Sequence, residues 1–325
     1  LKADTGQPLE VSLSELIDFF KSPSKGFLYR RLGVFLDDRG DALEDREPTH
    51  IERGLGQWSV LNSALQQTLA GDSTEDVYER MRLSGTLPLG VPGRIAFDQA
   101  TAPLNAIVTA HDSLVSGEAR SLPVDVQLGK TRLVGQVDHI YPGGRVIAHP
   151  SGSSAKHEIG LWLPHLVRRA IDPDPPAASM LIRKRGVDAE VLRLGTALTS
   201  QEARRLLEAI VEDYWLGQQA PLCFFPEKSQ AYVSALPLYK ADKHTNVATP
   251  EAYAVTRAAL AWTKSGQPGA EAKDTYNVTL HGQGEPFRPG YSMPGIPRDI
   301  APLFASIAAR FWGPFLKERD EEEGP

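Results

Sequence analysis

Apolar side chains recur every three or four residues in several parts of the chain, a spacing that predicts amphipathic helices. The first such segment follows a capping-box pattern at Ser12 and Glu15, and Pro23 ends it because proline lacks the backbone N–H that a helix needs. Residues 85–93 contain three glycines and two prolines and predict turns. The other predicted helices cover about residues 27–32, 54–70, 98–116, 155–170, 199–215, 249–263 and 299–316, with one more starting at the Ser73 cap.

The middle of the chain alternates apolar and polar residues, which predicts strands, and Pro142-Gly143-Gly144 predicts a hairpin turn. The predicted strands cover residues 122–128, 133–141, 145–149, 180–182 and 190–194. Helices, then a strand meander, then more helices indicate an α/β or α+β domain over residues 12–316, with its sheet at about 120–195. We expect residues 1–11 to be a loose lead-in and the acidic tail 317–325 to be disordered.

Composition narrows the class of protein. The chain has 325 residues, enough to bury a core without disulfides. Its single cysteine, Cys223, excludes an internal disulfide and a cysteine-held zinc or iron–sulfur site, and is typical of a reduced, intracellular setting. No apolar run approaches the roughly 20 residues that span a bilayer, so we expect no membrane partner. The first residue is Leu1 rather than methionine, which is consistent with a piece of a longer protein.

The net charge of -6 argues against a globally basic nucleic-acid binder but leaves a local basic channel open. Acidic residues gather in residues 37–53, which predicts a solvated loop or hairpin.

Common catalytic motifs are absent. The sequence has no phosphate-binding loop, no Gly-x-Ser-x-Gly and no His-Glu-x-x-His. Three evenly spaced histidines, His149, His157 and His165, raise the question of a metal site. His157 and His165 would lie on one helix about 12 Å apart, too far to share an ion, so we interpret all three as surface or half-buried histidines and expect no metal.

The central hairpin carries the most specific signal. Gly135-x-x-Asp138 on one strand, a tight turn, a second strand and a helix resemble the core of the RecB-like branch of the PD-(D/E)xK nucleases. That family holds magnesium with an Asp on the first strand and an acid-x-Lys step on the second, because the ion prefers hard oxygen ligands. Here His149 and Ser151 stand at the acid and lysine positions.

Two further positions of that family's site are also changed. Trp58 replaces an upstream histidine, and Gly160 stands where the following helix commonly has a glutamine. Only Asp138 keeps its type, and one carboxylate does not hold hydrated magnesium tightly. The resemblance therefore implies a degenerate site without catalytic residues.

A nuclease-like domain of this kind is similar to the C-terminal domain of the RecC family, the gamma subunits of exodeoxyribonuclease V. The similarity rests on the order and spacing of several short segments along most of the chain. These are Ser12 to Pro23, Tyr29 to Leu32, Gly85 to Gly90, His149-Pro150-Ser151, Gly160 to Val167, Ala220-Pro221-Leu222 and Pro314-Phe315-Leu316.

The resemblance implies a restriction-endonuclease-like (PD-(D/E)xK) fold with a central mixed sheet flanked by helices. It also implies a non-catalytic role in a cytoplasmic, bacterial helicase–nuclease that acts in double-strand-break repair and homologous recombination. The implied partners are the RecB and RecD subunits, duplex DNA ends and single-stranded DNA. Splitting of the duplex and guidance of the strands are the implied tasks. The domain would have no cofactor of its own, since Mg²⁺ and ATP are used by the partner subunits.

Basic side chains in the second half of the sheet region are candidates for phosphate contacts, because a strand path needs cations along a groove. The candidates are Arg168, Arg169, Arg183, Lys184 and Arg185. The five tryptophans could stack on bases, but their apolar surroundings favour core packing for most of them.

Two alternatives remain open at this point. One is an active metal-dependent nuclease that uses Asp138, His149 and an acid from elsewhere in the chain. The other is an intracellular protein-binding domain without a DNA role.

Overall fold

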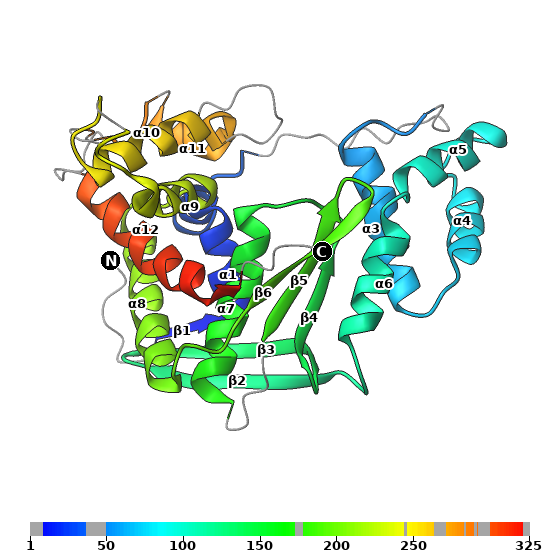
Figure 1. Ribbon diagram of the computed structural model, residues 1–325, viewed down its shortest axis with the longest axis horizontal. Helices are drawn as coiled ribbons and strands as arrows, with labels where there is room; N and C mark the ends of the chain where they lie inside the picture. Colours follow the sequence, from blue (N-terminus) through cyan, green and yellow to red (C-terminus); the bar gives the residue numbers. More distant parts are fainter. Residues whose placement is uncertain are drawn as a thin grey trace.

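The computed structural model describes residues 9–36, 50–172, 178–243, 246–262, 271–282, 284–288, 291 and 300–320. In this part of the chain a mixed sheet of seven strands lies between two groups of helices, which confirms the predicted α/β fold (Figure 1). The strands are β1 (Leu9–Ser12), β2 (Arg120–Leu128), β3 (Thr131–Tyr141), β4 (Gly144–His149), β5 (Ser179–Arg185), β6 (Asp188–Leu194) and β7 (Arg319–Asp320).

The helices form two groups (Figure 1). The first group consists of α3 to α6, and the second consists of α1, α2 and the helices after β4. They are α1 (Leu13–Lys21), α2 (Pro23–Gly26), α3 (Leu55–Leu69), α4 (Thr74–Leu83), α5 (Val91–Ala100), α6 (Leu104–Leu114), α7 (Ala155–Ile171), α8 (Ser200–Gln219), α9 (Pro226–Ala235), α10 (Pro250–Trp262), α11 (Thr275–His281) and α12 (Ile300–Glu318). A π-helical turn covers Phe27–Arg31, and short 3₁₀ turns cover Leu236–Leu238 and Glu271–Lys273.

The sheet runs in the order β1-β3-β4-β5-β6-β7, with β2 paired to β3. The pairs β2–β3, β3–β4 and β5–β6 are antiparallel and follow one another along the chain, as hairpins do. β4 and β5 are parallel, and α7 makes the long connection that a parallel pair needs. The predicted meander and the helix after it are therefore confirmed.

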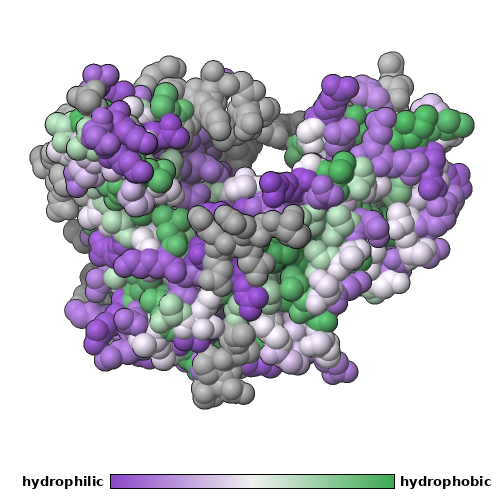
Figure 2. Space-filling view, viewed as in Figure 1, coloured by the Kyte–Doolittle hydropathy of each residue, from purple (hydrophilic) through white to green (hydrophobic). Residues whose placement is uncertain are grey.

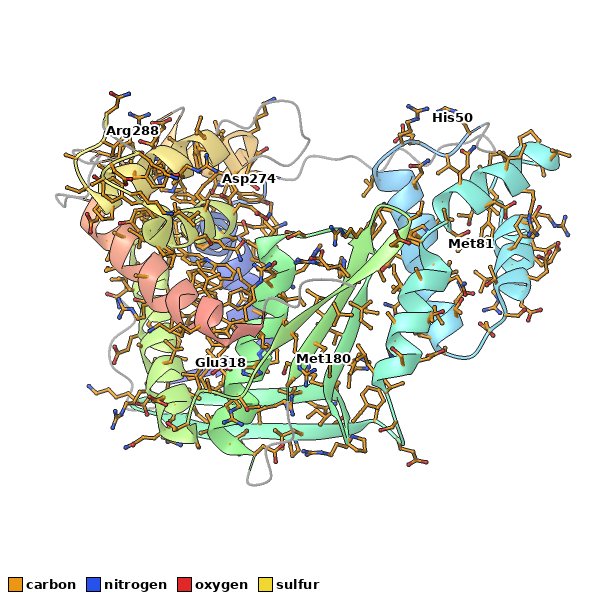
Figure 3. All side chains as sticks on the ribbon, viewed as in Figure 1. His50, Met81, Met180, Asp274, Arg288 and Glu318 are labelled. Carbon is orange, nitrogen blue, oxygen red and sulfur yellow. The ribbon has the colours of Figure 1, made fainter. Side chains whose placement is uncertain are left out.

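Each face of the sheet carries its own apolar core, and β5 contributes to both. Leu181 belongs to the larger core, with residues of α1, α7, α8, α9 and α12. Met180 and Ile182 belong to the smaller core, with residues of α3 to α6. Figure 3 labels Met180 and Met81, which are both members of the smaller core. Burial on both faces explains why β5 begins with an apolar run rather than an alternating pattern.

Both ends of the predicted domain need correction. Residues 9–12 are not a loose lead-in but strand β1, which pairs in parallel with Thr131 to Val134 of β3. The tail is not disordered from residue 317, because α12 continues to Glu318 and residues 319–320 pair with β6. The buried Glu318 carboxylate accepts hydrogen bonds from the backbone N–H groups of Ala197 and Leu198, which anchors this end (Figure 3). Residues 321–325 lie outside the described residues.

The first group of helices also differs from the prediction. The single helix expected over residues 98–116 is two helices, and α5 begins at Val91, inside the predicted turns. Pro92 is compatible with the first turn of a helix, where its missing N–H has no partner to lose. Gly93 lets the chain fold back, because a Cβ there would lie 1.9 Å from the Pro88 carbonyl oxygen.

Three helices, α2, α9 and α11, were not predicted. Most of the acidic segment 37–53 lies outside the described residues.

The space-filling view shows apolar side chains gathered over the N-terminal end of α5 (Figure 2), where Leu89, Val91 and Ile95 are exposed.

Gly135 of β3 lies where a side chain would obstruct close packing. Its φ is +143°, and a Cβ would lie 3.2 Å from the Cβ of Leu13 at the start of α1. The missing side chain therefore lets α1 approach β3.

Candidate functional site

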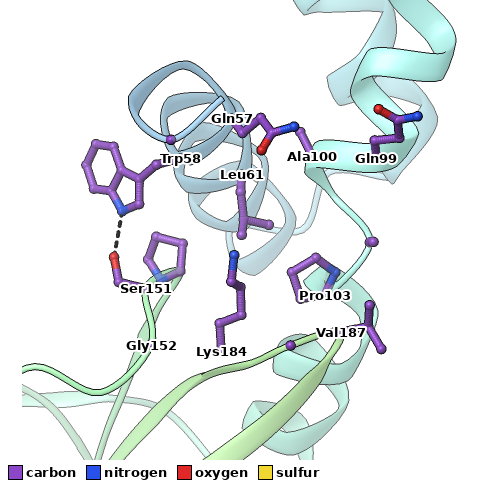
Figure 4. Close-up of a pocket in the computed structure, with 14 residues that line it drawn as sticks. Gln57, Trp58, Leu61, Gln99, Ala100, Pro103, Ser151, Gly152, Lys184 and Val187 are labelled. Atoms are coloured by element: carbon purple, nitrogen blue, oxygen red, sulfur yellow. Dashed lines mark hydrogen bonds between the residues drawn. The ribbon is translucent and has the colours of Figure 1, made fainter. Parts of the chain in front are cut away.

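A pocket of about 350 Å³ lies where α3 and the α5–α6 connection meet the loops that follow β4 and β5 (Figure 4). Its polar and aromatic walls come from Gln57 and Trp58 of α3, Gln99 of α5, Ser151 after β4 and Lys184 of β5. No aspartate or glutamate is among the described residues that line it, and Lys184 is its one charged side chain there. The pocket is therefore suited to a neutral or anionic ligand rather than to a cation.

Two residues that the resemblance assigned to a degenerate nuclease site, Trp58 and Ser151, meet in this pocket. The indole Nε1–H of Trp58 donates a hydrogen bond of 2.8 Å to the Oγ of Ser151 (Figure 4). The Ser151 carbonyl accepts from the backbone N–H of Lys184 at 3.1 Å, which ties the loop after β4 to β5. Trp58 is 37% exposed, so the bond fixes an indole that still faces solvent.

His149 lies next to this loop, and its Nδ1 accepts from the backbone N–H of Ser151 at 3.1 Å. Its ring faces that of His157 on α7, with centroids 3.7 Å apart. Burial, followed by the neighbouring His157 and Lys21, lowers the pKa of His149 to about 4. The imidazole is therefore neutral near pH 7, in agreement with its role as a hydrogen-bond acceptor.

Gly160 of α7 lies near Lys21 of α1, which also influences His149. A Cβ at Gly160 would lie 3.9 Å from the Cε of Lys21 on α1. A lysine thus comes close to the position where the resembling nucleases commonly have a glutamine. The same Lys21 ammonium is one of the two neighbours that, after burial, lower the pKa of His149.

Asp138 lies apart from these residues, in a bulge of β3. The pairing shifts between Arg120 and Leu122, so that Ser121 faces both Asp138 and His139, and His139 has a φ of 61°. Asp138 Oδ1 accepts hydrogen bonds from Ser121 Oγ at 2.6 Å and Gln136 Nε2 at 2.5 Å. These two hydrogen bonds lower the pKa of the Asp138 carboxyl.

Asp138 and His149 lie on neighbouring strands, as the resemblance predicts. However, β3 and β4 pair only next to their turn, at Ile140–Arg145 and Tyr141–Gly144, so Asp138 and His149 are not paired with each other. The structure therefore joins Trp58 to Ser151 and His149 to His157, and leaves Asp138 with other partners. Within the described ranges, no group of three or more His, Cys, Asp or Glu side chains is placed to hold a metal ion.

The basic candidates differ sharply in environment. Arg183 is 3% exposed and forms ion pairs with Glu158 at 2.7 Å and Glu190 at 3.1 Å. Arg168 is also buried and donates to Ser179 Oγ at 3.0 Å. The choice of these two arginines as phosphate contacts is contradicted, because a buried guanidinium held by protein acceptors cannot reach DNA.

The other three candidates are more accessible. Arg169 donates to the carbonyl oxygens of Thr196 and Leu198, which leaves it partly engaged in tying α7 to the turn before α8. Lys184 is half-buried in the pocket wall, and Arg185 is exposed at the end of β5. Lys184 and Arg185 are therefore the candidates best placed for an external anion.

His165, the third histidine, is buried against the sheet. Its Nδ1 lies 3.0 Å from Ser179 Oγ, and its ring stacks on Trp162. Burial is the main cause that lowers the pKa of His165 to about 3, with nearby arginines adding to it. The prediction that His165 is a surface or half-buried histidine is therefore wrong, because it is 1% exposed and its ring packs between Ser179 and Trp162.

The tryptophans divide as expected. Trp162, Trp262 and Trp312 are buried in the larger core. Trp215 is half-buried and donates to Thr131 Oγ1 at 2.8 Å, and Trp58 alone among the five is exposed.

Gln57, Gln99 and the pocket position of Lys184 were not predicted. Gln57 precedes Trp58 in the sequence, which is a weak signal for a shared site. No sequence pattern connects Gln99 or Lys184 to Trp58, because tertiary packing of α5 and β5 brings them together.

No helix in the part of the chain that the structure describes is both long and apolar enough to cross a membrane.

Comparison with known proteins agrees with the resemblance drawn from the hairpin. Residues 8–237 match the family model of the RecC C-terminal domain. The chain is 26% identical over 228 residues to the RecBCD enzyme subunit RecC of Escherichia coli K12, covering 70% of the chain and 19% of that protein. It is 28% identical over 233 residues to the RecC subunit of Mycobacterium tuberculosis CDC 1551, covering 70% of the chain and 20% of that protein.

The RecC subunit of Mycolicibacterium smegmatis is likewise 28% identical, over 235 residues, covering 70% of the chain and 21% of that protein. The chain thus spans about a fifth of the length of the curated relatives it matches. Since the family model covers well over half of its residues, the chain belongs to the RecC C-terminal domain family.

Proposed function

We propose that this chain is a non-catalytic DNA-handling and scaffold domain of a RecBCD-type helicase–nuclease, exodeoxyribonuclease V, which acts in double-strand-break repair and homologous recombination in the bacterial cytoplasm. The observation that carries the proposal is the Trp58–Ser151 hydrogen bond. It joins the two side chains that, on the resemblance, stand where a RecB-like nuclease would have a histidine and a lysine around its metal. The pocket beside that bond has no acid among its described lining residues.

The proposed partners are subunits of the RecB and RecD types. They would supply the magnesium-dependent nuclease and the ATP-driven motors. The sequence of this chain has no phosphate-binding loop, which such a motor needs to bind ATP. The family match supports this assignment, because the relatives are named as subunits of the RecBCD enzyme. In such a complex the domain would take part in splitting the duplex and guiding the strands.

DNA guidance would depend on a few cations near the pocket rather than on the whole surface, since the chain carries a net charge of -6. Lys184 and Arg185 are consecutive on β5, and the first lines the pocket. Sequence-independent binding of a strand requires this type of contact with phosphate oxygens.

The test measures cleavage and binding in parallel. The purified chain is incubated with end-labelled linear and forked DNA in Mg²⁺ or Mn²⁺, and fork affinity is titrated against salt. We expect no cleavage and binding that weakens steeply with salt. Cleavage that is lost in Asp138→Ala, but kept in the control Asp125→Ala on neighbouring β2, would instead support a metal-dependent nuclease that uses Asp138.

A further inference from the structure

The pocket beside Trp58 has features of a binding site that a degenerate active site does not require. Its lining combines one exposed aromatic ring, one cation and two side-chain amides. If the pocket were only the remnant of a lost active site, we would expect apolar side chains to fill it. This pocket remains open at about 350 Å³, near the lower end of the roughly 300–1,000 Å³ typical of ligand pockets.

The aromatic ring is held in place before any ligand arrives. Trp58 Nε1–H is already bonded to Ser151 Oγ, and Ser151 is bonded through its carbonyl to the backbone N–H of Lys184. The indole therefore has a fixed orientation and is partly exposed to solvent. A fixed aromatic side chain is a platform on which any nucleobase can stack, because every base has a π-face.

The polar groups of the pocket have hydrogen-bonding capacity to spare. In the described residues the side-chain amides of Gln57 and Gln99 have no hydrogen bond, and Lys184 has no ion pair. Figure 4 shows the Lys184 side chain extending into the pocket toward Leu61, with Trp58 on one side and Pro103 on the other. An amide offers both a donor and an acceptor, as base edges do, whereas an ammonium group suits a phosphate.

We propose that this pocket binds one unstacked nucleotide of single-stranded DNA. The base stacks on Trp58, its edge meets the amides of Gln57 and Gln99, and its phosphate pairs with Lys184. This inference rests on the proposed role in DNA handling and deepens it, since it names the ligand unit and the residues that hold it. The absence of acids from the described lining favours this ligand over a metal or a basic peptide.

The chain offers a matched control for each key residue. Trp215 lies in another pocket and makes the same kind of bond as Trp58, from its Nε1 to the Thr131 hydroxyl at 2.8 Å. Lys130 is an exposed lysine that lines the same pocket as Trp215. Trp215→Leu and Lys130→Gln therefore change an aromatic ring and a cation outside the site.

The experiment measures the affinity of the chain for a fluorescent oligo(dT) of about 12 nucleotides by anisotropy over a range of salt. We expect Trp58→Leu to weaken binding by about 5- to 100-fold, the usual effect of losing one base-stacking platform. Lys184→Gln should lower the slope of log K against log salt by about 0.7, the value for one single-strand phosphate contact. Trp215→Leu and Lys130→Gln should leave the affinity and slope near those of the unchanged chain.

Two further ligands separate the possible outcomes. An abasic oligonucleotide of equal length should bind more weakly and lose its dependence on Trp58, whereas thymidine monophosphate should bind far more weakly than the strand. Affinity for oligo(dT) that is unchanged by both Trp58→Leu and Lys184→Gln would overturn the pocket while leaving the DNA-handling role intact. Equal affinity for the monophosphate and the strand would overturn single-stranded DNA as the ligand, and no binding to any DNA would overturn both proposals.

Discussion

Arg183 of β5 and Glu158 of α7 form a buried ion pair, with Arg183 Nη1 2.7 Å from Glu158 Oε1 and side-chain exposures of 4% and 2%. Glu190 binds Arg183 Nε from the next strand, and Gln230 of α9 donates to the second oxygen of Glu158. The pair therefore links the sheet to α7 and α9. Because these partners bury and hold it, Arg183 is a structural residue, although Lys184, the next residue in the sequence, lines the pocket.

Arg183→Met is expected to destabilise the chain by about 3–5 kcal/mol, because it leaves the Glu158 carboxylate buried without its cation. Urea unfolding followed by circular dichroism measures the change in unfolding free energy. The control Arg185→Met, at an exposed position, should change it by less than about 0.5 kcal/mol. The double variant Arg183→Met/Glu158→Leu should recover part of the loss, and a double variant less stable than Arg183→Met would contradict this account.

Asp213 of α8 is expected to reduce stability at neutral pH. Burial raises the pKa of its carboxyl to about 6, although Arg310 Nε lies 3.3 Å away. Because this folded-state pKa is above the ordinary value, the protonated carboxyl favours the folded state. Its contribution to stability is fully present below about pH 4 and is lost as the pH rises through about 6. Asp213→Asn should therefore stabilise the chain at pH 7 by about 1–3 kcal/mol.

The same substitution should have little effect near pH 4, where the native carboxyl is already protonated in the folded state. Urea unfolding of both proteins at the two pH values measures this difference. A loss of stability at pH 7 would show that the Arg310 ion pair outweighs the desolvation of Asp213.

Acid should weaken the fold through its buried histidines. The pKa of His165 is lowered to about 3 by burial and by the nearby Arg168, Arg169 and Arg145. Above an ordinary histidine pKa of about 6.5 the folded and unfolded states are both neutral. Below it the unfolded state binds a proton that the folded state does not bind, so stability falls as the pH decreases toward 3.

His165→Asn should reduce the slope of unfolding free energy against pH by about 1.4 kcal/mol per pH unit between about pH 6 and 4, the value for one proton. His149 and His281, whose pKa values burial also lowers to about 4, should preserve the remaining slope. Chemical denaturation at several pH values provides the measurement. An unchanged slope would mean that His165 is protonated in the folded state.

Gly135→Ala is expected to destabilise the chain by about 2 kcal/mol or more, because the new Cβ would meet Leu13 in a backbone conformation that disfavours side chains. Gly129→Ala is the control, since Gly129 also has a positive φ but a Cβ at that position would have no other atom within 4 Å. Its loss should be only about 1 kcal/mol. Thermal melting of the two variants compares them, and equal losses would show that packing against α1 contributes little.

Much of the local structure follows from the sequence because its causes are local. The capping boxes that begin α1 and α8 are formed by residues three apart, Ser12 with Glu15 and Thr199 with Glu202. Strand alternation and the Pro-Gly-Gly turn likewise involve neighbours in the chain, and the hairpin of β3 and β4 formed where they predicted it. The RecC resemblance also rests on short segments and their order, which the comparisons confirm.

Long-range packing decided the rest. The end of α12 and strand β7 are ordered because the Glu318 carboxylate meets two N–H groups about 120 residues away in sequence, and no local acidic pattern contains that information. Arg183 and Lys184 have similar charges and adjacent positions, yet alternation along β5 directs the first toward buried Glu158 and the second into the pocket wall. The sequence by itself therefore determined most of the elements and the family, whereas burial and distant partners determined which polar side chains are structural and which remain available for a ligand.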